Sequence, residues 1–539
     1  VTKIGSFGDN TFSPVTLVIP DSVTDISNAF RYCRSLTNVT IPDSLTELDG
    51  AFLETPWLEN RRKENPLVIV NGTLLDGSTC KGDVVIPDGV TKIGSNAFND
   101  CTALTSVTIP DSVKEINRAA FSGCTSLTSV TLPDGLREIG VSAFNGCTSL
   151  TNVTFPDSIT EISSYAFSDT PWFEKKQKED PLVIVNGIVI DGKNCKGSVV
   201  IPDGVTKITG FAFFDCDKIT SVTIPDSVTE IGEQAFSHCT ALKSINIPNS
   251  MTGIGNFAFN DCSSLTSMTI PDSMTKINNG VFYKCTSLAS ITIPNSVTEI
   301  GDAAFTDTSL TSVTIPDSVT KIGSSAFGGT LLTSITIPDS VTEIGDHAFG
   351  GCASLTSVTI PTGVAEICEF AFGGTPWLES KRQEDPLVIV NGILIDGITC
   401  TGSVIIPDSV REIVECAFYK NEAVTSVTVP NGITKINSYF AYACLSLTSV
   451  KLPDGITEIG AHAFSFCPAL TSLEIPDGVT EIDSYAFSND TALTSVKLPD
   501  SVRKIGHGIF DDCQCDVTYK GKTYSPDNYK ALYNAIRGI

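Results

Sequence analysis

Basic residues are scarce in this chain of 539 residues, which has 35 lysines and arginines against 61 aspartates and glutamates. The formal net charge is −26 at pH 7, and the isoelectric point is about 4.5. Nucleic acids and anionic membrane surfaces bind proteins through basic faces. The charge balance therefore excludes nucleic acid as a partner and disfavours an anionic membrane surface.

Long apolar runs are also lacking. No stretch approaches the ~18 consecutive apolar residues that a membrane-spanning helix needs, so we expect no membrane span. Apolar residues still make up 41% of the chain, which is enough for a large core. The sequence starts inside a repeat, at Val1-Thr2-Lys3-Ile4-Gly5, and shows no signal peptide. We interpret this start as a mature or trimmed chain whose targeting segment is absent.

Catalytic and metal-binding patterns are missing as well. The sequence has no G-x-S-x-G, H-E-x-x-H or G-x-x-x-x-G-K motif. Its histidines occupy variable repeat positions, where we expect them at the surface: His238, His347, His462 and His507. Zinc sites need closely paired cysteine or histidine ligands, and no such pair recurs. We therefore predict a protein that is not an enzyme and that has no cofactor and no metal site.

What the sequence does contain is a repeat of about 23 residues, a length within the range of known solenoid units. Pro87, Pro110 and Pro133 each follow an apolar residue and recur at a constant interval, since 110 − 87 = 23 and 133 − 110 = 23. The same apolar-Pro pair recurs along almost the whole chain, with three double steps after Pro42, Pro156 and Pro361. Such a repeat indicates a solenoid, because one unit cannot bury its own apolar face but stacked units form a continuous core.

Within one unit, residues 86–108, the alternation predicts a short strand. Leu104 and Val107 should point inward, while Ser106 and Thr108 should point outward. Pro87 and the following Asp and Gly predict a turn. Phenylalanine recurs once per unit and should form a stacked aromatic spine. These phenylalanines are Phe98, Phe121, Phe144, Phe213, Phe236, Phe259, Phe282, Phe305, Phe327, Phe349, Phe372, Phe418, Phe464, Phe487 and Phe510.

Most of the 18 cysteines occupy one repeat position, the one that Cys101 has relative to Pro87 (101 − 87 = 14). At an inward bend, a small apolar thiol packs well, so we predict a buried column of free thiols. The column consists of Cys101, Cys124, Cys147, Cys216, Cys239, Cys262, Cys285, Cys352, Cys444, Cys467 and Cys513. A disulfide stays open for Cys513 with Cys515, and for the off-column Cys368 and Cys416.

The three double steps carry near-copies of one insert, at about 55–83, 170–198 and 375–403. Each begins Thr-Pro-Trp, continues through a charged stretch and ends in a Pro-Leu-Val-Ile-Val-Asn-Gly segment. The pattern predicts one or two helical turns and then a hairpin closed by Asn-Gly, and we expect the inserts to decorate or extend a repeat without breaking the solenoid. We predict a solenoid over 1–515 and a C-terminal hairpin-helix cap over 516–539, with Ser525 as N-cap and Pro526 in the first helical position.

The repeat resembles that of the BspA-like family of bacterial surface leucine-rich repeat proteins. Its pattern I-P-x-x-V-x-x-I-G-x-x-A-F-x-x-C-x-x-L-x-x-V-x is matched nearly throughout by residues 109–131. The resemblance covers essentially the whole chain. It implies a right-handed leucine-rich repeat solenoid of about 20 repeats, with a curved parallel sheet and short strands or turns on the opposite wall. It also implies a secreted or cell-surface location and adhesion to host matrix proteins or other microbes, and it carries over no catalytic residues.

The outward Ser/Thr strip is the first candidate binding surface, and we expect it to form the concave face. Thr also favours strands for purely structural reasons, so both interpretations stay open. The strip comprises Ser106, Thr108, Ser129, Thr131, Ser221, Thr223, Ser357 and Thr359. Near the C-terminus, Lys451, Glu474 and Lys497 replace Thr in this strip. A departure from a repeat is where specificity can lie, so these three are candidate ligand-binding residues.

Trp57, Trp172 and Trp377, one in each insert, are the second candidate set, since Trp is a favoured interface anchor. Their recurrence in each insert favours a packing role. An Asp column could hold calcium between repeats, but the ligand spacing of a calcium loop is absent, so we interpret it as turn capping and a solvated acidic edge. A Lys/Glu column is interpreted as charge pairs across repeats. The Asp column is Asp88, Asp111, Asp134, Asp226, Asp272 and Asp317. The Lys/Glu column is Lys92, Glu115, Glu138, Lys207, Glu230, Lys276 and Glu299.

The functional hypothesis is a non-catalytic binding or adhesion scaffold, secreted or at the cell surface, whose partner is an extracellular protein, a microbial surface or a glycan. A passive structural spacer and an accessory module of a larger secreted protein are the alternatives. The first predicts saturable binding and the spacer predicts none. The sequence leaves the ligand and the oligomeric state open.

Overall fold

A computed structural model describes residues 2–5 and 15–537 of the chain. Val1, where the sequence starts inside a repeat, lies outside the described residues. The chain divides into two compact units, Val1–Cys262 (unit 1) and Ser263–Ile539 (unit 2). Each unit is a stack of parallel β-structure, and the chain forms about 22 turns in all, close to the 20 expected.

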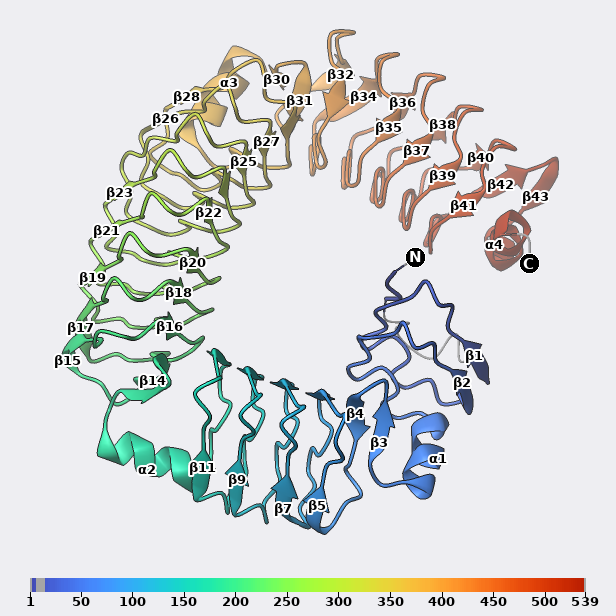
Figure 1. The fold of residues 1–539 in the computed structure, drawn as a ribbon. Coiled ribbons are helices and arrows are strands. Elements are labelled where there is room, and N and C mark those ends of the chain that lie inside the picture. Colours follow the sequence, from blue (N-terminus) through green and yellow to red (C-terminus); the bar gives the residue numbers. More distant parts are fainter. Residues whose placement is uncertain (1, 6–14, 538–539) are drawn as a thin grey trace. The chain divides into compact units, whose positions relative to one another are not determined.

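One wall of each unit is a ladder of mostly three- to five-residue strands, which we call the long-strand ladder (Figure 1). In unit 1 its strands are β1 (Thr16–Val18), β2 (Asn38–Thr40), β5 (Gly82–Val85), β7 (Leu104–Thr108), β9 (Ser129–Thr131), β11 (Asn152–Thr154), β15 (Gly197–Val200), β17 (Ile219–Thr223) and β19 (Ser244–Asn246). In unit 2 they are β21 (Ser267–Thr269), β23 (Ser290–Thr292), β26 (Ser334–Thr336), β28 (Ser357–Thr359), β32 (Gly402–Ile405), β34 (Val424–Thr428), β36 (Ser449–Lys451), β38 (Ser472–Leu473) and β40 (Ser495–Lys497).

The opposite wall is a ladder of two-residue strands, the short-strand ladder. In unit 1 it contains β6 (Lys92–Ile93), β8 (Glu115–Ile116), β10 (Glu138–Ile139), β12 (Glu161–Ile162), β16 (Lys207–Ile208), β18 (Glu230–Ile231) and β20 (Gly253–Ile254). In unit 2 it contains β22 (Lys276–Ile277), β24 (Glu299–Ile300), β25 (Lys321–Ile322), β27 (Glu343–Ile344), β29 (Glu366–Ile367), β33 (Glu412–Ile413), β35 (Lys435–Ile436), β37 (Glu458–Ile459), β39 (Glu481–Ile482) and β41 (Lys504–Ile505).

Both ladders arise from the alternation of polar and apolar residues. In β9, Val130 is buried while Ser129 and Thr131 are exposed, as predicted for a strand with one face on the core. Strands one repeat apart pair in parallel and in exact register, so that Val130 stands opposite Val153. In-register pairing keeps each apolar column inside and each polar row outside.

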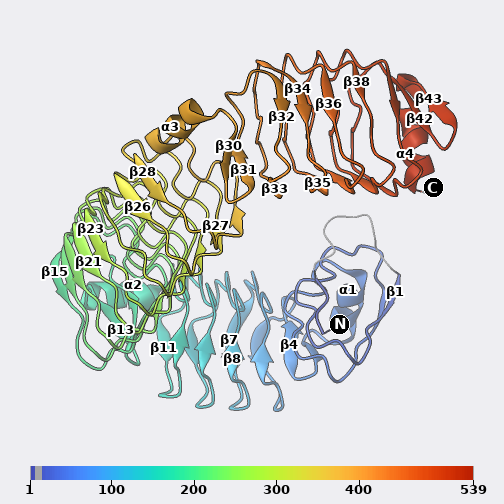
Figure 2. The same cartoon turned by 90° about the horizontal axis from the view of Figure 1, so that it is seen from above.

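Within each unit taken by itself, the short-strand ladder lies on the inner side of the bend and the long-strand ladder on the outer side (Figure 1). In Figure 2 the two ladders of unit 2 occupy opposite walls, with β34 and β36 on one side and β33 and β35 on the other. The prediction that the Ser/Thr strip forms the concave face is therefore wrong. Both walls alternate polar and apolar residues, so the pattern alone does not tell which wall is inner.

The core of each unit is built from columns of like residues, as predicted. The phenylalanine rings stack across neighbouring repeats, as for Phe98, Phe121 and Phe144, whose centroids are 4.9 and 5.0 Å apart with interplanar angles of 8° and 4°. Phe440 is an exception, because its repeat reads Phe-Ala instead of Ala-Phe. Its ring meets those of Phe418 and Phe464 edge-on, at 5.3 and 5.8 Å.

The cysteine column binds neighbouring repeats together through hydrogen bonds. A typical buried thiol donates to the main-chain carbonyl of the spine residue one repeat earlier; Cys124 reaches the oxygen of Phe98 at 3.1 Å, and Cys147 that of Phe121 at 3.0 Å. All 18 cysteines lie among the described residues, and none of them forms a disulfide. Every one is buried except Cys368, which is half-buried. The predicted thiol column is confirmed, and Cys513 and Cys515 form no disulfide.

Each insert adds a helix, one extra strand and a complete turn of the solenoid. The elements are α1 (Pro56–Glu64), β3 (Val68–Val70) and β4 (Thr73–Asp76) in the first; α2 (Pro171–Glu179), β13 (Val183–Val185) and β14 (Ile188–Asp191) in the second; and α3 (Pro376–Glu384), β30 (Val388–Val390) and β31 (Ile393–Asp396) in the third. The second hairpin strand pairs in parallel with the next short strand, as β4 does with β6. The inserts therefore extend the solenoid without breaking it, as predicted.

Local sequence explains the shape of the insert. Thr55 accepts a hydrogen bond from the main-chain N–H of Leu58, and Pro56 starts the helix, which is nine residues long. The predicted Asn-Gly turn is present, and Asn71 and Gly72 both have positive φ values, of 48° and 75°, as this hairpin type requires. The nine-residue helix is slightly longer than the one or two turns that the sequence predicted.

The C-terminal segment forms a hairpin and a helix: β42 (Asp516–Tyr519), β43 (Lys522–Tyr524), a 3-10 turn η1 (Pro526–Asn528) and α4 (Tyr529–Arg537). Ser525 occupies the N-cap position and Pro526 the first position, as predicted, but the Ser525 side chain makes no capping hydrogen bond. The turn that follows Ser525 is 3-10, and the main-chain N–H of Asn528 donates to the main-chain oxygen of Ser525 at 2.8 Å. No helix among the described residues is long and apolar enough to cross a membrane.

Candidate binding surfaces

The short-strand ladder carries the predicted charge pairs across repeats. Lys92 contacts Glu47 at 2.9 Å and Glu115 at 3.2 Å, and Lys207 contacts Glu161 and Glu230 at 3.1 and 3.0 Å. Although burial acts to lower it, hydrogen bonds to the two glutamates raise the pKa of Lys92 to about 12. These charges are used largely to pair with one another, so this row offers few free groups to a ligand.

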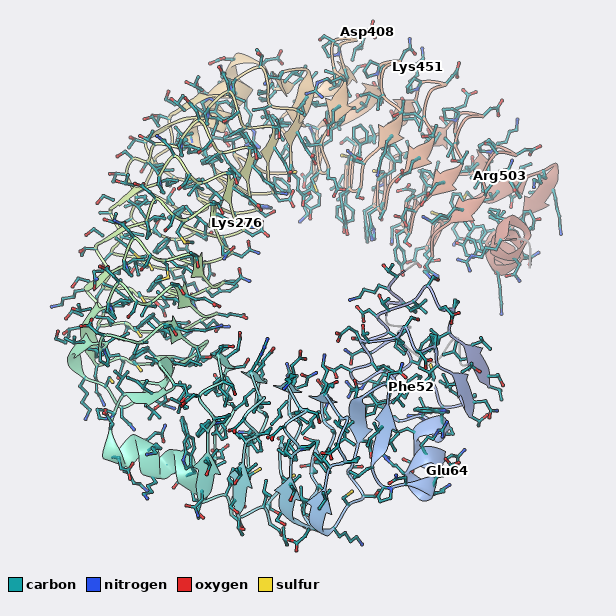
Figure 3. All side chains as sticks on the ribbon, viewed as in Figure 1. Phe52, Glu64, Lys276, Asp408, Lys451 and Arg503 are labelled. Atoms are coloured by element: carbon teal, nitrogen blue, oxygen red, sulfur yellow. The ribbon has the colours of Figure 1, made fainter. Side chains whose placement is uncertain are left out.

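The long-strand ladder of unit 2 presents the three departures from the Ser/Thr strip. Lys451 ends β36, Glu474 follows β38 directly, and Lys497 ends β40, and all three side chains are exposed. Register pairs Thr428 with Lys451 and Lys497 with Thr518. The strands β36 and β38 pair in register up to the residues just before Lys451 and Glu474, and β40 is the next long strand of this wall. All three residues are described, and no ion pair joins them. Figure 3 shows Lys451 on the outer side of its unit, whereas Lys276 projects from the short-strand ladder.

The three tryptophans are buried, with 4%, 6% and 7% of Trp57, Trp172 and Trp377 exposed. Each indole packs on the phenylalanine that ends a stretch of the aromatic spine: Trp57 on Phe52 at 4.5 Å, and Trp172 on Phe167 at 4.9 Å. Trp377 packs in the same way at 4.8 Å. This burial favours the packing role that the sequence also allowed.

The Asp column and the histidines do not form a binding or catalytic cluster among the described residues. The side chains of the Asp column are exposed, and no cluster of three or more metal-ligating side chains occurs in the described part of the chain. His347 and His507 are exposed, while His238 and His462 are half-buried. The Nδ1 atom of His238 lies 3.2 Å from Asp261, and burial lowers the pKa of His462 between Tyr439 and Tyr485.

The structure also reveals a site that the sequence reasoning missed, at the base of each insert helix. In the first insert, Arg62 forms two hydrogen bonds with the buried carboxylate of Asp76, at 2.9 and 2.6 Å. In the third insert, Arg382 does the same with Asp396, at 3.0 and 2.7 Å. The second insert has Gln177 at the arginine position. Aligning the three inserts with one another would have shown this change.

The fold and these surfaces define a leucine-rich repeat solenoid. A family model described as a BspA type leucine rich repeat region in six copies matches residues 2–66, 77–179, 193–308, 275–386 and 398–516. The chain therefore belongs to the BspA-type leucine-rich repeat family, as the repeat pattern predicted. This family and fold are typically non-catalytic.

Several solved structures are similar. A leucine rich cell surface protein from Faecalibacterium prausnitzii is 31% identical, over 65% of this chain and 92% of that one, with a TM-score of 0.41. A leucine-rich repeat protein from Bacteroides ovatus is 24% identical, over 94% of this chain and 86% of that one, with a TM-score of 0.22. The T. pallidum leucine rich repeat protein is 31% identical, over 32% of this chain and 73% of that one, with a TM-score of 0.24. Among curated proteins, none matches the chain.

Proposed function

We propose that this chain is a non-catalytic binding scaffold, secreted or held at a cell surface, that adheres to an extracellular protein, a microbial surface or a glycan. The observation that carries the proposal is the charged row of Lys451, Glu474 and Lys497. These side chains are exposed and form no ion pair with one another, although the same position carries Thr in many other repeats.

A rigid ladder makes such a row suitable for binding. The strands β36 and β38 are paired in register, which holds Lys451 and Glu474 at a fixed spacing before any ligand arrives, and Lys497 lies on β40, which pairs with β42 of the C-terminal hairpin. Preorganised groups lose little conformational freedom on binding, and a long repeated surface allows many weak contacts to add up. The printed description of the F. prausnitzii relative as a cell surface protein supports the proposed location.

The proposal is tested with the full chain on arrays of matrix proteins, bacterial surfaces and glycans. We expect saturable binding to at least one ligand, and a loss of tenfold or more in affinity for the triple variant Lys451→Thr, Glu474→Thr, Lys497→Thr. The matched control is Lys276→Thr, Glu299→Thr, Lys321→Thr, which removes the same charges from the short-strand ladder of the same unit. Absence of any saturable ligand would favour the passive spacer, and equal losses in both variants would refute the role of the row.

A further inference from the structure

The three inserts are near-copies of one another, so they form an internal comparison at one position. Each holds a carboxylate at the end of the second hairpin strand, Asp76, Asp191 and Asp396, and these residues are only 1%, 8% and 3% exposed. Burying a carboxylate without a counter-charge is costly, and a guanidinium that binds both oxygens is the usual solution. The first and third inserts supply that guanidinium from their own helix.

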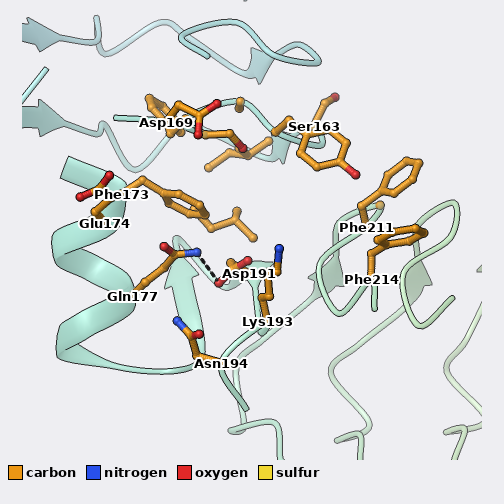
Figure 4. A pocket seen from close by; sticks show the side chains of 17 residues that line it. Ser163, Asp169, Phe173, Glu174, Gln177, Asp191, Lys193, Asn194, Phe211 and Phe214 are labelled. Atoms are coloured by element: carbon orange, nitrogen blue, oxygen red, sulfur yellow. Dashed lines mark hydrogen bonds between the residues drawn. The ribbon is translucent and has the colours of Figure 1, made fainter. Parts of the chain in front are cut away.

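The second insert does not supply it. Gln177 of α2 donates one hydrogen bond from Nε2 to Asp191 Oδ2 at 3.0 Å and brings no positive charge (Figure 4). Burial raises the pKa of Asp191 above its ordinary value, although the Gln177 hydrogen bond and the main chain and charge of Lys193 oppose this. The carboxylate of the second insert is therefore buried without the counter-charge that its two counterparts have.

A cavity accompanies the substitution. Asp191 and Gln177 line a hollow of about 550 Å³, whereas the hollow at the same place in the third insert, beside Asp396, holds only about 10 Å³. The hollow lies entirely within unit 1, between α2 and the turns that flank it.

Aromatic rings form one wall of this cavity. Tyr165 contacts Phe211 at 5.1 Å between ring centroids, and Phe211 contacts Phe214 at 5.5 Å; all three line the hollow. Tyr165 is 46% exposed, so the wall reaches the surface and the cavity is accessible. The equivalent positions of the first insert, Gly50, Asn96 and Asn99, carry no ring.

The other charged groups around the cavity do not replace the missing arginine. Lys193 lines it but is exposed and forms no ion pair with Asp191, although both residues are described. Asp169 and Glu174 also line it and add negative charge. The cavity therefore combines a buried carboxylate, an aromatic wall and an excess of acid, and these are the features that bind a guanidinium cation.

We propose that the cavity of the second insert binds an arginine side chain of a protein partner, whose guanidinium takes the place that Arg62 and Arg382 fill in the other two inserts. The identity of the partner as an extracellular protein rests on the proposed function, but the chemistry of the cavity does not. The net charge of −26 favours the approach of such a basic partner.

The probe is Nα-acetyl-arginine N-methylamide, which carries only the guanidinium charge, studied with the full chain by saturation-transfer NMR and calorimetry. The comparison compounds are the citrulline analogue, which is neutral but of the same shape, and the lysine analogue. We expect one bound equivalent of the arginine compound, at least tenfold weaker binding of the lysine compound, and no binding of the citrulline compound. Equal binding of arginine and citrulline compounds would overturn the proposal, and equal binding of the lysine compound would overturn its guanidinium specificity.

Two variants test the site itself. Gln177→Arg should restore the internal pair, raise the melting temperature and abolish probe binding, because the cavity is then filled from within. Asp191→Asn should abolish binding without that stabilisation. The matched control Arg382→Gln, in the third insert, should leave the affinity of the cavity in the second insert unchanged. Unaltered probe binding in Gln177→Arg would overturn the proposal for the cavity. It would leave the proposal for the charged row intact, because the array experiment tests that row separately.

Discussion

At the scale of single residues, the stacking of repeats depends on side chains that fit one another across neighbouring turns. The inserts show this most sharply. Their shortened turns place Gly77, Gly192 and Gly397 directly against the spine phenylalanine of the next repeat. A Cβ atom on Gly192 would lie 2.0 Å from Cε1 of Phe213, and one on Gly77 would lie 2.2 Å from the same atom of Phe98. Only the absence of a side chain lets the ring occupy the end of its column.

Gly192→Ala should therefore destabilise the protein, because the new methyl group overlaps the ring of Phe213, which is fully buried. We expect a loss of about 1–3 kcal/mol in the free energy of unfolding, the usual cost of overpacking. Urea denaturation followed by circular dichroism measures it. The control is Gly253→Ala, where the nearest atom to the added Cβ is Glu230 Cγ at 3.7 Å. Equal stability of the two variants would show that the Phe213 ring can move aside.

At the scale of elements, the short-strand ladder is a row of charges whose pattern sets its electrostatic energy. Most lysines in it alternate with glutamates, but β8, β10 and β12 place Glu115, Glu138 and Glu161 in consecutive register. Burial, followed by the charges of Glu161 and Glu115, raises the pKa of Glu138 above its ordinary value of 4.5. Like charges opposite one another destabilise a sheet.

The sign of the pH effect follows from this shift. A carboxyl group whose pKa is raised by folding holds its proton more tightly in the folded state, so ionisation destabilises the fold. The destabilisation is present above the folded pKa and is relieved as the pH falls through that value towards 4.5. We expect Glu138→Gln to increase the free energy of unfolding at pH 7 by about 0.5 kcal/mol, the scale of exposed charge interactions.

Chemical denaturation at pH 7 and at pH 4 measures this effect, and the gain should disappear at pH 4. The matched control is Glu230→Gln, which removes a glutamate that pairs with Lys207 at 3.0 Å and should give no gain at either pH. A gain of the same size at both pH values would mean that the effect does not come from the charge of Glu138.

At the scale of the whole molecule, one kind of hydrogen bond recurs from repeat to repeat. A buried thiol donates to the carbonyl of the preceding spine residue in both units, as with Cys239 and Phe213 at 3.2 Å and with Cys352 and Phe327 at 3.1 Å. Each thiol adds a second hydrogen bond to a carbonyl that also accepts one from a main-chain N–H three residues further on, as Phe213 does from Cys216 and Phe327 from Thr330. Because the same bond recurs in many repeats and the thiols that form it are buried, we expect the column to stay reduced and protected in the native protein.

Thiol chemistry tests this molecule-wide arrangement. The native protein should react slowly with a thiol reagent, because 17 of the 18 cysteines are buried and burial raises the pKa even of the half-buried Cys368, to about 12. Denaturation without reductant should release all 18 thiols. The absorbance of the chromophore that the reagent releases gives the number of reactive thiols in the native and in the denatured protein. A count of 16 or fewer after denaturation would reveal a disulfide, and rapid labelling of many thiols in the native state would show that the column is open.

The sequence alone determined the repeat and most of what it buries. A constant period with alternating strands leaves one consistent way to stack, so the phenylalanine and cysteine columns, the insert hairpins and the C-terminal cap followed from spacing and turn chemistry. The family followed from the same pattern, since residues 109–131 already carried it.

Only the tertiary structure decided those features that depend on contacts between segments far apart in the sequence. The pattern is polar on both walls, so only the fold showed that the Ser/Thr strip lies on the outer side of each unit. The burial of Trp172 depends on how α2 packs against the spine. The partnership of Arg62 with Asp76, and its absence at Gln177, joins residues that are 14 apart and brought together by the turn between helix and hairpin. Periodicity fixes which residues are equivalent between repeats, whereas contacts and cavities depend on how particular side chains fill the space between them.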